Sequence, residues 1–170
     1  MNNLSDKEKE IYDNKEKNLK IFKLLHDSIL MKDYKVLQKE QGLLPKTYTN
    51  NNQDFEDHIL AAANSKHKAI ELYRTSLTAY DSICAELEYF SAQLKLYLSE
   101  GFLKEHGFDR ATDSLRDSFV KSNVTIKDLI KVKGDLESLS GATERLVKAF
   151  ENDETNCRRL LERKTKYLGN

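Results

Sequence analysis

Hydrophobic residues recur every three or four positions along most of this sequence, which is the spacing of one face of an α-helix. The longest such stripe runs from about Asp54 to Ser99 and is sustained over about six heptads, as in a coiled coil. Polar Lys66 and Ser91 interrupt it. Its members are Phe55, Ile59, Ala62, Lys66, Ile70, Tyr73, Leu77, Tyr80, Cys84, Leu87, Ser91, Leu94 and Leu98. We expect one long helix here, capped by Asp54 and ended by Gly101.

Two further helical stretches flank it. The first, from about Ser5 to Gln41, opens with the capping box of Ser5 and Glu8 and carries an intermittent apolar stripe. The second begins at the N-cap candidate Thr112 and breaks at 122–123. It resumes at a second cap candidate, Thr125, as a longer helix. Gly134 and Gly141 lie inside that helix, where they allow either close helix approach or a bend.

Breaker residues divide these stretches. Gly42, Pro45 and the polar run 47–53 read as a helix stop followed by a linker. We therefore expect a charged helical arm over 1–41, a linker over 42–53 and a helical domain over 54–170. With a turn over 101–112, the predicted fold is all-α, a long antiparallel coiled-coil-like hairpin with an N-terminal helical arm. The seams are long and narrow, so we also expect an oligomer.

Composition supports this fold and narrows the function. The chain has 170 residues, 33% of them charged, with one proline and six glycines, which is typical of long helices. Its formal net charge is +0, which argues against coating nucleic acid through bulk positive charge. The sequence shows no membrane span and no apolar signal-peptide core. The separated thiols of Cys84 and Cys157 suit a reducing compartment, so we expect a cytoplasmic protein.

Catalytic and cofactor motifs are not evident in the sequence. It has no phosphate-binding glycine loop, and the histidines at 26, 58, 67 and 106 match no metal-ligand spacing. Cys84 lies on the apolar stripe, where a core role is expected rather than a nucleophilic one. We therefore expect a protein that is not an enzyme and has no cofactor or metal.

Basic and aromatic residues leave two interpretations open. The run 158–167 (RRLLERKTKY) is basic, and Arg158, Arg159, Arg163, Lys164 and Lys166 are candidates for phosphate contacts. The alternatives are a solvated helix end, where cations favour the C-terminal dipole, and a docking site for an acidic partner. The stripe residues serve either as core or as a seam between copies, and tyrosines among them could instead stack on bases. The candidate oligomer seam consists of Ile70, Tyr73, Leu77, Tyr80, Leu87 and Leu94.

The region from about Ala61 to Tyr167 resembles the UvsY recombination mediators of tailed phages. The stretch 94–101 (LKLYLSEG) looks like that family's basic and aromatic helix end before a glycine turn. The stretch 119–132 (FVKSNVTIKDLIKV) resembles its short helix, break and long C-terminal helix. The resemblance implies a ring-like oligomer that binds single-stranded DNA. Lys95 would then be a DNA-contacting residue, although the family's neighbouring basic position is Gln93 here.

Two functions follow from these patterns. The first is a non-catalytic oligomer that binds single-stranded DNA and helps to load a recombinase, with the recombinase and a single-strand-binding protein as partners. The alternative is a helical assembly or adaptor subunit whose partners are the helices of a larger protein complex. The long heptad stripe and the charged arm favour the alternative, and the resemblance favours the first.

Overall fold

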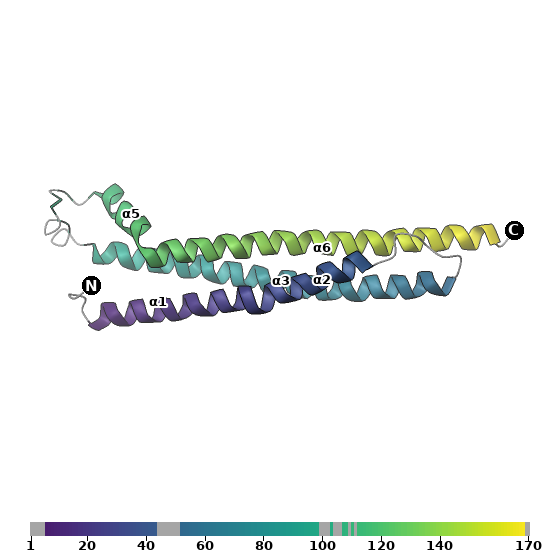
Figure 1. Cartoon of the computed structure of the whole chain (residues 1–170). Coiled ribbons are helices and arrows are strands. Elements are labelled where there is room, and N and C mark those ends of the chain that lie inside the picture. The colour runs from purple at the N-terminus through teal and green to yellow at the C-terminus, as the bar shows by residue number, and fades with distance from the viewer. Residues whose placement is uncertain are drawn as a thin grey trace. The chain divides into compact units, whose positions relative to one another are not determined.

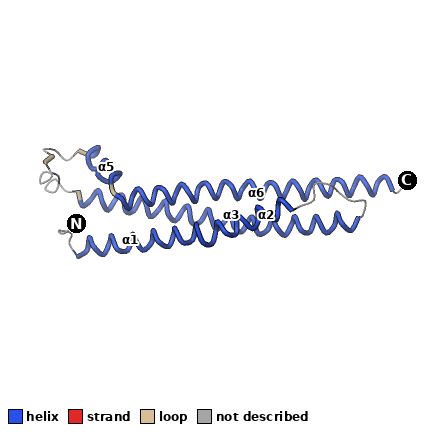
Figure 2. Tube along the Cα trace, viewed as in Figure 1, coloured by secondary structure: helices blue, strands red, loops and turns tan. Residues whose placement is uncertain are grey.

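Helices make up nearly all of the structure. This computed structural model describes residues 6–43, 52–98, 103, 107, 108, 110 and 112–168. Figure 2 shows helices and short loops over these residues, and none of them belongs to a strand. The all-α prediction is therefore confirmed.

The helices follow one another in the order drawn in Figure 1. They are α1 (Asp6–Leu24), a π-helical segment η1 (Leu25–Leu30), α2 (Met31–Leu43), α3 (Asn52–Tyr97), α5 (Asp113–Ser122) and α6 (Val124–Leu168). Helix α3 contains neither glycine nor proline, which explains how it continues for 46 residues. The long helix expected from the main stripe is thus present, and it begins two residues before the predicted start at Asp54.

Helix termini show which cap predictions hold. Thr112 caps α5 as expected, because its Oγ1 accepts a hydrogen bond from the Leu115 amide at 3.2 Å. The cap predicted at Thr125 is wrong, since Asn123 Oδ1 accepts from the Ile126 amide at 3.2 Å and α6 starts at Val124. Asp54 lies in the first turn of α3 rather than at its cap.

Some boundary predictions fall outside the described residues. These include Ser5 of the capping box, Gly101, and positions 44–51 of the expected linker. Gly42 itself lies inside α2, which ends at Leu43, so the first stop signal does not end the helix.

The chain divides into two compact units, each built from several helices. Unit 1 comprises Met1–His26 and Thr78–Leu136, and unit 2 comprises Asp27–Leu77 and Glu137–Asn170. Helices α3 and α6 each contribute a segment to both units. The division into arm, linker and hairpin domain stays a prediction.

Unit 1 packs α1 and α5 with the second part of α3 and the first part of α6. Its interior holds large apolar side chains, of which Phe90 and Leu129 are fully buried. Burying each of these stabilises the fold by about 1.5 to 3 kcal/mol. A buried Lys15 on α1 pairs with Glu86 of α3 and lies 4.6 Å from the centre of the Tyr89 ring. The charged first helix is therefore anchored by a paired charge as well as by Leu19.

Unit 2 packs α2 with the first part of α3 and the last part of α6. Lys66 of α3 pairs with Glu154 of α6, and Lys164 of α6 lies 5.6 Å from the Phe55 ring of α3. As residue numbers rise along α3 they fall along α6, so these two segments are antiparallel. This arrangement fits the predicted hairpin, and the oligomeric part of that prediction is not shown.

The buried stripe of α3 differs by one residue from the predicted seam. Its buried residues keep a regular three-and-four spacing over most of the helix, and many of them are small. They are Phe55, His58, Ala62, Ser65, Ala69, Leu72, Ser76, Ala79, Ile83 and Phe90. Of the predicted seam residues, Leu77 is 37% exposed and the other five are half-buried. The large side chains line one flank of the stripe, because α3 packs against helices on two sides.

The π-helical segment η1 shifts the buried face of the first helical stretch. In α1 the buried positions include Lys15, and continuing by heptads from it leads to Phe22, Ile29 and Val36. The buried positions after η1 are instead Leu30 and Leu37, one residue later. A π-turn adds one residue to a helix, which accounts for this shift. Ile29 and Val36 consequently face outwards.

Candidate functional site

The predicted nucleic-acid-binding residues lie on both units. Lys95, on the part of α3 that belongs to unit 1, is exposed and pairs with Asp117 of α5. The hydrogen bond from Lys95 lowers the pKa of the Asp117 carboxyl. Arg158, Arg159, Arg163, Lys164 and Lys166 all lie on the part of α6 that belongs to unit 2. Lys95 thus has an anionic partner within its own unit.

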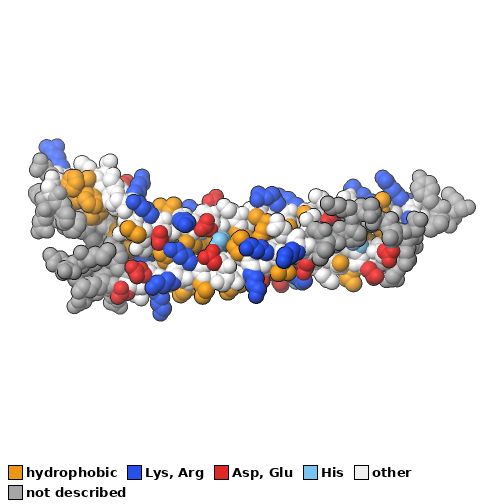
Figure 3. Space-filling model, viewed as in Figure 1, with side chains coloured by type: hydrophobic (Ala, Val, Ile, Leu, Met, Phe, Trp, Pro, Cys, Tyr) orange, Lys and Arg blue, Asp and Glu red, His pale blue; other side chains and the backbone are white. Residues whose placement is uncertain are grey.

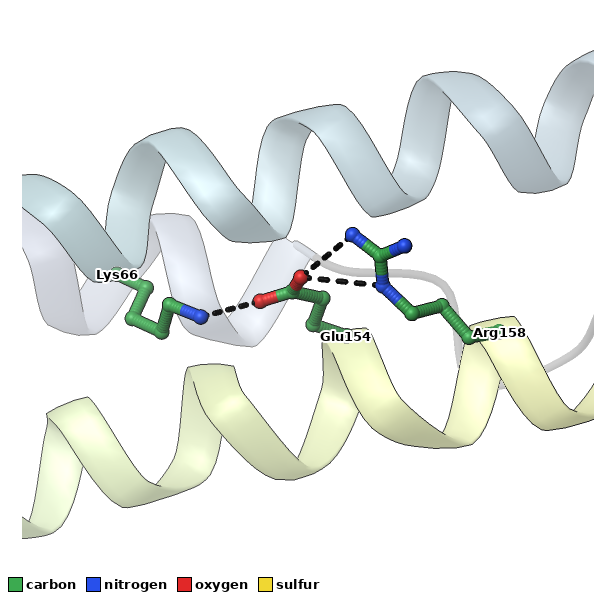
Figure 4. A network of polar contacts seen from close by, with 3 residues as sticks. All are labelled: Lys66, Glu154 and Arg158. Atoms are coloured by element: carbon green, nitrogen blue, oxygen red, sulfur yellow. Dashed lines mark hydrogen bonds and ion pairs between the residues drawn. The ribbon is translucent and has the colours of Figure 1, made fainter.

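Arg158 and Lys164 also contact groups of their own unit. Figure 4 shows Lys66 and Arg158 on opposite sides of the Glu154 carboxylate. Arg158 donates to Glu154 Oε1 from Nη2 at 2.8 Å and from Nε at 3.2 Å. Lys164 lies over the Phe55 ring. Arg159, Arg163 and Lys166 are exposed. A DNA contact by this run stays a prediction.

Unit 2 contains a groove between α2 and α3. Its volume is about 450 Å³. Buried Leu30 of η1, Leu37 of α2 and Leu72 of α3 line it. Ile29 and Val36 at its edge are 51% and 49% exposed. The last two are seven residues apart, so they lie about 10.5 Å apart along the helix, which is one heptad of a coiled coil. The groove therefore has the spacing that a packed helix requires.

The polar lining of this groove is mainly acidic. Asp33, Glu40 and Glu71 contribute carboxylates, Lys68 contributes an amine, and Thr75 is the remaining polar member. The Ser65 hydroxyl donates to Glu40 Oε2 at 2.8 Å and Lys68 Nζ donates to Oε1 at 3.2 Å. These bonds, the one from Ser65 first, lower the pKa of Glu40 and keep it ionised at neutral pH. The positive charge of Lys68 is thus paired with Glu40, and the carboxylates of Asp33 and Glu71 give the lining a net negative charge.

Elsewhere the surface mixes both signs of charge. On the face drawn in Figure 3, basic and acidic side chains are interspersed along the helices, with hydrophobic side chains between them. Such a surface resembles a solvated helix face more than a continuous track for a phosphate backbone.

Histidine, cysteine and acidic side chains are the groups that could hold a metal ion in this molecule. Within the described ranges, no group of three histidine, cysteine or acidic side chains is placed to hold a metal ion. Cys84 is half-buried and Cys157 is buried. None of the described helices combines the length and apolar character that a membrane span needs.

Sequence reasoning missed the groove, although a signal was present. Phe22, Ile29 and Val36 repeat at seven-residue intervals beside a second apolar pair, Leu30 and Leu37. Two apolar stripes on one helix indicate two contact faces. The partners of α2 on α3 were not readable, because Lys68, Glu71 and Thr75 look like ordinary surface positions in a heptad pattern.

The fold defines the class of the molecule, an all-α protein of long helices, with a groove between two of them in unit 2. No protein-family model matches the sequence, and no solved structure matches it. The sequence is similar to nucleoporin nup211 of Schizosaccharomyces pombe, with 28% identity over 134 residues. That match covers 76% of this chain and 7% of the length of nup211.

Proposed function

We propose that this chain is a non-catalytic helical subunit of a larger protein complex, which acts through coiled-coil contacts. The observation that carries the proposal is the groove of unit 2, with Ile29 and Val36 exposed at heptad spacing on its edge. Helices with a second apolar stripe at this spacing pack against further helices. Exposed apolar side chains gathered beside a groove are typical of interaction sites.

The similarity to nup211 supports the same reading. A chain similar to part of a nucleoporin is consistent with a structural role inside an assembly. We extend the proposal to an assembly of the nuclear-pore kind on this ground alone. The cytoplasmic location expected from the sequence is the alternative. The proteins recovered with the native assembly would distinguish these two locations.

Isolation of the native assembly tests the proposal. The full chain, tagged and expressed at its natural level in its source cells, is purified under mild conditions, sized, and cross-linked through its lysines. We expect a heteromeric assembly with cross-links to other proteins from Lys68, which lines the groove. A chain recovered as a free monomer without cross-links to any protein would contradict the proposal.

Two variants connect that assembly to the groove. Changing both Ile29 and Val36 to aspartate places charge at the groove edge and should reduce recovery of the assembly at least about 10-fold. Leu60 is a matched control, because it is 62% exposed on the unit 2 part of α3 and does not line the groove. Leu60→Asp should leave recovery unchanged, and equal loss in both variants would count against a role for the groove.

The recombination-mediator reading remains a second prediction. It rests on the resemblance to UvsY and on the exposed basic residues of α6.

A further inference from the structure

We infer that the groove between α2 and α3 takes an amphipathic α-helix whose flanking positions carry lysine or arginine. The inference rests on the proposed function, because it specifies the partner of the same surface. It makes a separate claim about chemistry, namely that the occupant is helical, apolar on one face and basic beside it.

Apolar geometry points to a helix as the occupant. Leu30, Leu37 and Leu72 give the groove a continuous apolar base, and Ile29 and Val36 extend it at one edge. A helix placed there would contact α2 and α3 together, so its apolar residues would enter a hollow formed by two helices. Such packing lets side chains interdigitate as knobs into holes.

The π-turn in η1 accounts for the exposure of Ile29 and Val36 at the edge of the groove. If α1 and α2 were one regular helix, Ile29 and Val36 would continue the buried phase that includes Lys15. Instead η1 moves Leu30 and Leu37 into the interior and turns Ile29 and Val36 towards the groove. π-turns of this kind are frequent at functional sites. An irregular turn that exposes two apolar residues is therefore consistent with a binding role.

Charge selects a basic helix over an acidic one. The lining has three carboxylates and one amine, and the amine of Lys68 already bonds to Glu40. Asp33 on α2 and Glu71 on α3 are both exposed, so they flank an occupant from the two helices that form the groove. Glu71 lies 3.4 Å from His67 Nε2, a contact that is an ion pair only when the imidazole is protonated. Cations on the occupant would complement these two carboxylates.

Designed peptides test the inference with the purified full chain. Two labelled helical peptides carry the same leucines at their a and d positions, and differ only in having lysine or glutamate at the flanking positions. Binding is followed by fluorescence anisotropy. We expect the lysine peptide to bind at least about 10-fold more tightly than the glutamate peptide, as two or more favourable charge pairs would produce.

Charge reversal of the groove gives the decisive comparison. The double variant Asp33→Lys with Glu71→Lys should invert the preference, so that the glutamate peptide binds more tightly. The matched control is Glu56→Lys with Glu151→Lys, two exposed positions of unit 2 outside the groove that change the net charge equally. The control should keep the original preference. Circular dichroism of each variant confirms that it retains its helices.

Several outcomes would overturn the inference. These are no binding of either peptide, no preference between them, or an inversion that the control variant produces as well. Self-association of the chain that the double reversal abolishes would assign the groove to a second copy and would also overturn it. If the native assembly forms but the peptides show no preference, the groove inference fails while the proposed function stands.

Discussion

At the scale of single residues, Glu154 shows how a polar group is placed inside a helical pair. Its side chain is 13% exposed, and it accepts hydrogen bonds from Lys66 and Arg158 (Figure 4). The hydrogen bond from Lys66, followed by that from Arg158, lowers its pKa below the usual 4.5. A nearly buried carboxylate with two cationic partners fixes the register of α3 against α6, because a slipped register would leave it unpaired.

Replacing Glu154 with glutamine should destabilise the fold in a pH-dependent way. We expect a loss of about 1 to 2 kcal/mol at pH 7, because Lys66 and Arg158 lose their anionic partner. The folded-state pKa is lowered, so the contribution of the carboxylate is fully present above pH 4.5 and is lost as pH falls through the folded value. The measurement is urea unfolding of both proteins from neutral to acidic pH. A difference that stays constant down to about pH 2 would contradict this account.

Gly134 is a position where a substitution should stabilise the fold, in contrast to Glu154. The sequence left open whether Gly134 and Gly141 allow close helix approach. A β-carbon added at Gly134 would meet nothing within 4 Å, and one at Gly141 would meet only Arg145 Nη1 at 3.9 Å. Close approach within the chain therefore requires neither glycine.

The change Gly134→Ala should stabilise the chain by about 0.5 to 1 kcal/mol, since it lowers the entropy of the unfolded state and improves helix propensity. Denaturant unfolding measures the effect. Gly107 is a suitable contrast, because its φ of 85° strains any L side chain and its replacement by alanine should destabilise. A loss of stability in Gly134→Ala would show that another part of the structure needs the glycine.

At the scale of the elements, the sequence predicted helices well and their contact faces less well. The continuous heptad pattern and the absence of breakers fixed the extent of α3 to within two residues. Over most of α3 the buried stripe lies one residue away from the predicted apolar stripe, because the predicted stripe follows the large side chains, whereas a seam between copies stays a prediction. Ala62, Ala69 and Ala79, which are buried, gave a weaker signal than the tyrosines beside them. Arg158 was readable from the basic run, and its pairing with Glu154 follows from their i,i+4 spacing on α6. The pairing of Lys95 with Asp117 was not readable, because it depends on a contact between α3 and α5.

The π-turn was also unreadable in advance. Its residues LHDSIL contain no breaker, and a one-residue shift in phase becomes visible only when the buried positions on both sides are known. The sequence offers two apolar pairs one residue apart, Ile29 with Val36 and Leu30 with Leu37. Local helix propensity does not decide which pair is buried.

Deleting one residue from η1 tests the phase shift. Removing Ser28 should convert the π-turn into regular α-helix while Leu30 and Leu37 keep their inward orientation, so stability should change by less than about 1 kcal/mol. Removing Lys35 is the matched control, because it turns Leu37 away from the interior and should cost about 2 to 5 kcal/mol, as for loss of a buried leucine. Thermal unfolding followed by circular dichroism compares the two. Equal losses would show that η1 does not absorb the extra residue.

At the scale of the whole molecule, two surfaces are candidates for binding a partner: the groove of unit 2 and the basic residues. A recombination mediator would bind single-stranded DNA through Lys95 and the basic run of α6. We predict that, if it does so, an oligonucleotide will show salt-sensitive anisotropy, because phosphate contacts release counterions. Neutralising Arg159, Arg163 and Lys166 should then weaken binding and reduce the salt slope. These residues make a cleaner test than Arg158, whose change would also disturb Glu154.

The same titration has a clear negative outcome. Absence of binding at low salt would remove the nucleic-acid reading and leave the complex subunit as the function of the chain. Binding that persists after the three neutralisations would show that the basic run of α6 is not the contact.

The central claim is that the chain works through helix contacts at the groove of unit 2, and side-chain footprinting tests it most directly. Hydroxyl radicals label exposed side chains of the dilute purified chain and of the chain within its native assembly, and mass spectrometry compares the labelling. Ile29 and Val36, which are 51% and 49% exposed in the free chain, should lose most of their labelling in the assembly. Leu60, on the same unit, should keep its labelling. Unchanged labelling of Ile29 and Val36 within the assembly would contradict the account.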